Sequence, residues 1–163
     1  MAPSPGRIAI FLPLAVSMGV TFCTVIVHAL ALIAVVHFVR RGIRLGYAGV
    51  RFWKDVTVVA GTTLLALLAH LIEIAGWAVV FALCGEFPHF AAAFYHSAVN
   101  YTSLGDGGDV VMSGSWKLLG PLETADGMLM FGVSTAMIFA IVQRLIQTRV
   151  ERLTQSRLHD SDG

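Results

Sequence analysis

Two ionisable residues, His70 and Glu73, stand three positions apart within the apolar run Val56–Leu83. In a helix this spacing places both side chains on one face. Ionisable groups at membrane depth commonly mark functional sites and face the protein interior. The pair could bind a proton, bind a cation, sense pH, or form a structural hydrogen-bonded pair. We favour the structural pair, because a metal site needs three or four ligands and this helix offers two. Such a pair would reach polar residues further along the chain: Ser97, Asn100 or Thr102.

A second group, Thr102–Asp109, is rich in glycine and aspartate and reads TSLGDGGD. Its three glycines predict backbone angles that other residues rarely adopt. The segment before it, Phe90–Tyr101, is apolar and helix-permissive, but a helix of that length covers only about 18 Å. Non-helical backbone at membrane depth survives only where protein or a water-filled cavity satisfies it. These features predict a re-entrant pore loop; the alternative is an ordinary loop with a turn at Asp106-Gly107.

The elements that position these residues are membrane spans. Hydrophobic residues make up 56% of the chain and charged residues only 13%, against about 25% charged residues in soluble domains. The apolar residues form long runs, which predict three spanning helices: Ile8–Phe38, Val56–Leu83 and Ala125–Val142. We therefore expect an all-α membrane protein whose partner is the lipid bilayer. The net charge of +1 gives no indication of a nucleic-acid partner.

Basic residues predict the topology. Five of them lie in the linker Val39–Asp55, and four arginines follow Ile141. Positive loops stay in the cytoplasm, so the N-terminus is expected outside and the C-terminus inside. The chain then divides into an N-terminal helix with its basic linker (1–55), a pore module (56–148) and a short cytoplasmic tail (149–163).

The second half of the chain resembles the pore module of the tetrameric potassium-channel superfamily. The matching residues are the short helix from Phe94 onward, the octet Thr102–Asp109, Trp116, and the stretch LLGPLE at 118–123, followed by a helix with glycines. In particular it looks like the small bacterial two-pore-domain-type channels, whose pattern is YTTLGYGD. The resemblance implies a multi-pass protein of the bacterial inner membrane, a homotetramer, and no cofactor other than the permeating cation, potassium.

In that family four chains contribute main-chain carbonyls that replace the hydration shell of the ion. Carried over residue by residue, the selectivity filter is Thr102, Ser103, Leu104, Gly105, Asp106, Gly107, Gly108 and Asp109. Two positions depart from the family pattern: Asp106 replaces an aromatic residue, and Gly108 is additional. A ring of four carboxylates favours cations but not potassium specifically.

Further residues have modulatory or structural interpretations. The candidate gating or modulatory residues are His70, Glu73 and Gly132. Gly127 and Gly132 suit close helix packing or a hinge. His28 is expected to bond a neighbouring helix. The tryptophans are interpreted as interface anchors: Trp53, Trp77 and Trp116.

Two other functions are left open by the sequence. One is a non-conducting membrane scaffold or sensor that retains the pore-module fold, which the departures at Asp106 and Gly108 motivate. The other is a membrane-embedded enzyme or metal protein built on His70, Glu73 and His96. No nucleophile–base set supports catalysis, so we expect a channel subunit and not an enzyme.

Overall fold

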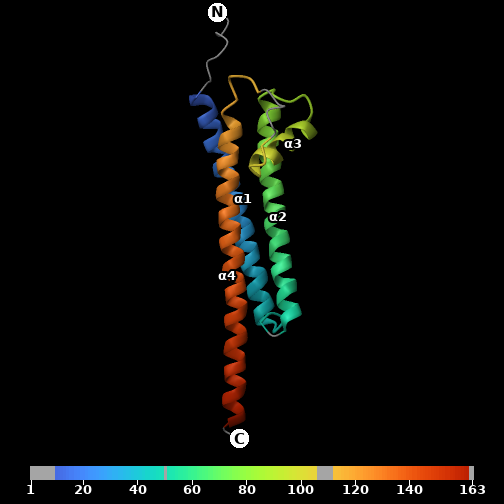
Figure 1. Ribbon diagram of the computed structural model, residues 1–163, viewed down its shortest axis with the longest axis vertical. Coiled ribbons are helices and arrows are strands. Elements are labelled where there is room, and N and C mark those ends of the chain that lie inside the picture. The colour runs from blue at the N-terminus through green and yellow to red at the C-terminus, as the bar shows by residue number, and fades with distance from the viewer. Residues whose placement is uncertain (1–9, 50, 106–111, 162–163) are drawn as a thin grey trace, which may run out of the picture. The chain divides into compact units, whose positions relative to one another are not determined.

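The computed structural model describes residues 10–49, 51–105 and 112–161, and every regular element in that part of the chain is a helix. Figure 1 shows the four helices: α1 (Phe11–Arg44), α2 (Phe52–Leu83), α3 (Phe90–Tyr101) and α4 (Leu119–Ser161). Three of them, α1, α2 and α4, are long and apolar enough to cross a membrane. The expected all-α fold with three candidate spans is confirmed.

The helix ends differ from the predicted ends of the apolar runs. α1 continues to Arg44, α2 begins at Phe52, and α4 extends well beyond the predicted span at both ends. An apolar run shows which residues contact lipid or the protein interior, but it does not show where the helix ends. Arginines are good helix formers, so a helix can continue through them into water. Arg41 and Arg44 also lie in the last turn of α1, where positive charge complements the helix dipole. Only α3 has the predicted bounds.

Contacts divide the chain into two compact units. The first unit comprises Met1–Ala29 and Ala69–Gly132, and the second comprises Leu30–Leu68 and Val133–Gly163. Each of the three long helices contributes one part to each unit. The predicted division of the chain at residues 55 and 148 concerns function, and it stays a prediction.

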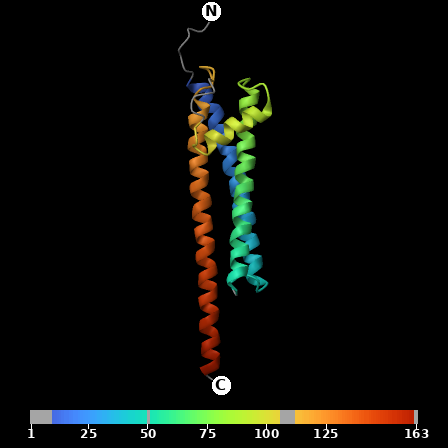
Figure 2. The same cartoon turned by 45° about the vertical axis from the view of Figure 1, so that its right-hand side comes forward.

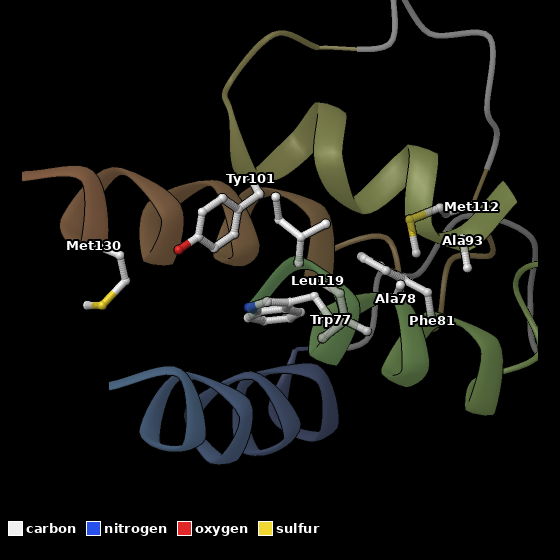
Figure 3. Close-up of a cluster of buried hydrophobic side chains, with 9 residues drawn as sticks. Trp77, Ala78, Phe81, Ala93, Tyr101, Met112, Leu119 and Met130 are labelled. Atoms are coloured by element: carbon white, nitrogen blue, oxygen red, sulfur yellow. The ribbon is translucent and has the colours of Figure 1, made fainter. Parts of the chain in front are cut away.

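The first unit packs α3 against α2 and α4. Figures 1 and 2 show α3 beside the C-terminal part of α2 and the N-terminal part of α4. Its core contains Trp77 and Phe81 of α2, Tyr101 of α3 and Leu119 of α4, all fully buried, and Figure 3 shows these side chains. The interface role predicted for Trp77 is therefore wrong, because the indole lies inside the protein.

The polarity of the first unit is the reverse of that of a soluble domain. Polar and ionisable side chains lie inside it, including His28, Glu73 and Asp126, each at most 3% exposed. Large apolar side chains lie outside, such as Phe22 at 67% and Leu129 at 62%. Large exposed apolar surfaces are covered by lipid or by other protein, so this distribution agrees with the apolar spans.

The second unit contains the connection between α1 and α2. Gly49 adopts a left-handed conformation (φ +74°), and its main-chain N–H donates to the Asp55 carboxylate (2.6 Å). Asp55 also forms an ion pair with Arg149 of α4. A small core lies beside these contacts, formed by Val35, Val39, Ala48, Val58, Ile141 and Leu145.

We predict that Gly49→Ala destabilises the protein more than Gly46→Ala. Both glycines have positive φ, which costs an alanine roughly 1–2 kcal/mol. A Cβ at Gly49 would also lie 2.8 Å from Thr148 Cγ2, whereas nothing lies within 4 Å at Gly46. The measurement is the thermal unfolding midpoint in detergent. Adding Thr148→Ser, which removes the Cγ2 methyl, should recover part of the loss; equal midpoints for both alanine variants would contradict the packing described.

Candidate functional site

The carboxylate of Glu73 joins three helices. Glu73 Oε1 lies 2.9 Å from Nδ1 of His28 on α1, and Oε2 lies 3.2 Å from Nδ1 of His70 on α2. The hydroxyl of Tyr101, the last residue of α3, donates to the same Oε2 and lies 3.2 Å from His70 Nδ1. All four side chains are buried. One carboxylate therefore connects α1, α2 and the end of α3.

The sequence predictions for these residues are confirmed in part. His70 and Glu73 do share a helix face and do connect α2 to α3. Their partner is Tyr101, whereas none of the residues expected from the sequence, Ser97, Asn100 and Thr102, bonds them in the described hydrogen bonds. His28 bonds a neighbouring helix as expected. Sequence reasoning missed Tyr101 because its hydroxyl sits at the far end of an apolar ring, so the residue counts as part of the apolar segment Phe90–Tyr101.

Tyr101 acts as a hydrogen-bond donor at neutral pH. Burial raises the pKa of its phenol, and the hydrogen bond to Glu73 raises this pKa further. The hydroxyl therefore keeps its proton and donates a hydrogen bond, which the carboxylate accepts. This bond fixes the C-terminal end of α3 to the C-terminal half of α2.

A second carboxyl group, that of Asp126 on α4, binds α1 and α2 one helical turn away from the residues that meet at Glu73. Asp126 of α4 accepts hydrogen bonds from Trp77 Nε1 (2.9 Å) and from Thr24 Oγ1 (2.9 Å). Thr24 precedes His28 by four residues on α1, and Trp77 follows Glu73 by four on α2. The two carboxyl groups therefore tie the same faces of α1 and α2 at successive turns.

A third carboxyl group connects α4 to α3. The hydroxyl of Ser97 contacts the carboxyl of Glu123 and lies 2.8 Å from the carbonyl oxygen of Ile74. The hydroxyl of Thr124 lies 2.9 Å from the carbonyl oxygen of Asn100. Hydrogen bonds from side chains therefore connect α3 to α2 and α4 at its middle as well as at its end.

His96 does not join the group around Glu73. Its ring packs against Phe81 and Phe87, with centroid separations of 5.1 and 4.8 Å. Among the described residues, the one group of three metal-ligating side chains within 4.8 Å of one another is His28, His70 and Glu73. His96 is therefore wrong as a neighbour of His70 and Glu73, and the histidine that lies beside them is His28.

The end of α3 is a tight turn that uses its N–H groups internally. The main-chain N–H of Ser103 donates to the carbonyl of Asn100 (2.9 Å), and that of Leu104 donates to the carbonyl of Val99 (3.0 Å). This pair of bonds is the Schellman motif, which requires a left-handed residue directly after the cap. Ser103 takes that conformation (φ +56°), and Gly105 is left-handed as well (φ +74°).

The carbonyl oxygens of this turn have no hydrogen-bond donor within the part of the chain that the structure describes. Between described residues, no hydrogen bond ends on a carbonyl oxygen of Thr102, Ser103, Leu104 or Gly105. All four residues are exposed, Leu104 at 77%. These are the first four predicted filter residues. The other four, Asp106, Gly107, Gly108 and Asp109, lie outside the described residues.

The two glycines of α4 differ in what surrounds them. A Cβ added at Gly127 would overlap the carbonyl group of Tyr101, so α3 and α4 approach closely there. At Gly132 nothing lies within 4 Å. Close packing is confirmed for Gly127 and does not explain Gly132, whose gating role stays a prediction.

In comparisons with known proteins, no family model, no curated protein and no solved structure matches this chain.

Gly127→Ala is expected to destabilise the protein by about 1–3 kcal/mol, as overpacking typically does, because the new methyl group must displace the end of α3. Gly132→Ala on the same helix is the matched control. Since space is open there, it should leave the unfolding midpoint unchanged or raise it, as alanine is the better helix former by about 1 kcal/mol. Thermal unfolding in detergent distinguishes the two variants. A Gly127→Ala midpoint at or above that of Gly132→Ala would show that α3 does not lie against α4 as described.

Tyr101→Phe is expected to cost about 1–3 kcal/mol, because it removes a donor from a buried carboxylate while keeping the ring. Tyr95→Phe provides the control on the same helix: Tyr95 is 69% exposed, and surface changes of this kind stay within about 0.5 kcal/mol. Protease resistance of α3 at increasing temperature reports the difference. Equal resistance of the two variants would be inconsistent with a Tyr101–Glu73 bond.

Proposed function

We propose that this chain is a subunit of a potassium-channel-like cation channel that assembles as a homotetramer around a central pore. The observation that carries the proposal is the turn after α3, where the N–H groups of Thr102, Ser103 and Leu104 bond inward and the carbonyl oxygens of Thr102–Gly105 accept no hydrogen bond from the described residues. Along Thr102–Leu104 the N–H groups are already used, so this part of the main chain offers its carbonyl oxygens as acceptors, and acceptors bind cations. An anion would need the N–H side.

The left-handed residues support this role. Ser103 and Gly105 have positive φ, while Leu104 between them does not. A main chain with left-handed residues departs from the alternating carbonyl directions of a strand, and carbonyls that face an ion can replace part of its hydration shell. The C-terminal end of α3 adds the partial negative charge of its helix dipole at the same place.

The placement of α3 between two candidate spans supports a re-entrant position. It has 12 residues, and at about 1.5 Å per residue it cannot cross a hydrocarbon core of about 30 Å. Its bonds to Glu73 and Glu123 attach it to helices that are long enough to cross. Non-helical backbone at that depth is tolerated where it lines a water-filled cavity, which is the environment that a pore supplies.

One chain cannot enclose an axis, so the pore requires symmetry. The number four comes from the resemblance to the potassium-channel superfamily. Exposed apolar side chains near the turn provide surface for neighbouring subunits or lipid, among them Leu104 at 77%, Tyr95 at 69% and Met128 at 61%. We place the assembly in the bacterial inner membrane, with the N-terminus outside and the C-terminus in the cytoplasm.

The proposed selectivity is for cations, without strict preference for potassium. Asp106 stands where the related channels have an aromatic residue. A ring of carboxylates near the axis attracts both potassium and the smaller sodium ion. Gly132 is the proposed bend of α4, since the first compact unit ends at this residue and nothing packs against it within 4 Å. His70 and Glu73 would modulate the pore through their bonds to Tyr101.

Ion flux from vesicles containing the purified full-length chain tests the proposal. Potassium and sodium are expected to pass and chloride is not. Gly105→Ala should reduce the flux, because a left-handed alanine costs roughly 1–2 kcal/mol, a factor of about 5–30 in the population of the turn.

The control is Gly85→Ala in the loop between α2 and α3. Gly85 has φ +75° and Gly105 has φ +74°, and neither has a neighbour within 4 Å, so the strain is equal and only the location differs. Gly85→Ala should keep the flux. The proposal fails if vesicles with and without protein leak cations equally across pH and membrane tension, or if both alanine variants conduct alike.

A further inference from the structure

The first unit contains buried carboxyl groups with little positive charge near them. Glu73, Glu123 and Asp126 are each at most 2% exposed. Among the described residues of this unit there is no arginine, and its one lysine, Lys117, is exposed. Isolated ionised groups are very costly to bury. The compensating charge inside the unit must therefore be carried by protons or by a bound cation.

One carboxyl group has the neighbours that a metal ion needs. His28, His70 and Glu73 each offer a ligand atom, and these atoms lie within 4.8 Å of one another. The imidazole nitrogens of His28 and His70 lie 2.9 and 3.2 Å from oxygens of Glu73. Ligands around a tetrahedral ion with bonds of about 2.0–2.2 Å are about 3.3–3.5 Å apart. Shifts of a few tenths of an ångström would therefore admit an ion between them.

We propose that His28, His70 and Glu73 form a binding site for a divalent transition-metal ion of the Zn²⁺ class. Two imidazoles and one carboxylate suit zinc and its neighbours, whereas calcium and magnesium prefer oxygen ligands throughout. The hydroxyl of Tyr101, which contacts both Glu73 and His70, stands beside the fourth position. The three ligands lie outside the residues of the proposed pore turn, and metal binding does not depend on ion conduction.

The surroundings of the three ligands are already ordered. α1 and α2 are also joined one turn away, where Thr24 and Trp77 both donate to Asp126. The bond from Tyr101 fixes the orientation of the Glu73 carboxylate, as partners of metal ligands commonly do. A metal ion here would connect α1 to α2 directly, so its binding should stabilise the folded protein.

Cobalt is the probe, because Co²⁺ replaces Zn²⁺ and absorbs visible light according to its ligands. Purified full-length protein, stripped with chelator, is dialysed against Co²⁺. We expect one Co²⁺ per chain, visible bands of a four-coordinate site, and a higher unfolding midpoint with Co²⁺ or Zn²⁺ but not with Mg²⁺. Glu73→Gln and His28→Gln should each weaken Co²⁺ binding by at least about 10–100-fold.

Two control variants separate this site from adventitious binding. His96→Gln removes a buried histidine of the same unit that lies outside the group, and His37→Gln/His89→Gln removes two exposed histidines. Both should retain the bound Co²⁺. Absence of stoichiometric Co²⁺ in the wild-type protein, or its loss in the His37→Gln/His89→Gln variant, would overturn the proposal. Should Glu73→Gln or His28→Gln fail to fold, the wild-type spectrum and the metal-specific rise in midpoint decide the matter, because a protein without the site shows neither.

Discussion

A carboxyl group buried between apolar helices must have hydrogen-bond partners, and this requirement organises the first unit. Glu73 is 1% exposed, although the residues just before it on α2, Leu71 and Ile72, are 43% and 50% exposed. Removing one partner of a buried ion pair typically costs about 3–5 kcal/mol. His28, His70 and Tyr101 supply the partners. Because they come from three helices, satisfying one carboxylate determines how α1, α2 and α3 meet.

The consequence reaches the turn that follows α3. Tyr101 is the last residue of the helix, so the bond that satisfies Glu73 also holds the point from which the turn begins. Because Gly127 has no side chain, α4 can approach the carbonyl group of Tyr101 closely. Ser103 then reverses the chain with its N–H bonded inward. The carbonyls that accept no hydrogen bond from the described residues are thus carried by a unit that buries carboxyl groups beside an apolar core and exposes further large apolar side chains.

The sequence predicted this arrangement where the signal is local. The bounds of α3 and the shared face of His70 and Glu73 follow from short-range spacing. The third partner, His28, lies 45 residues from Glu73, and helix periodicity does not say which helices are neighbours. Trp77 was misinterpreted because an indole suits both a membrane interface and a buried acceptor, and its acceptor, Asp126, is 49 residues away. Helix ends were misplaced because hydropathy indicates environment and not hydrogen bonding.

The channel function, the fourfold assembly and the orientation in the membrane are proposals that depend on how copies of the turn are arranged. The most direct measurement is an experimental structure of the full-length protein in lipid nanodiscs. Four chains should surround one axis, with the carbonyl oxygens of Thr102–Gly105 facing it at the depth of the hydrocarbon core. A monomer, or an assembly whose turn faces lipid or lies outside the bilayer, would contradict the account.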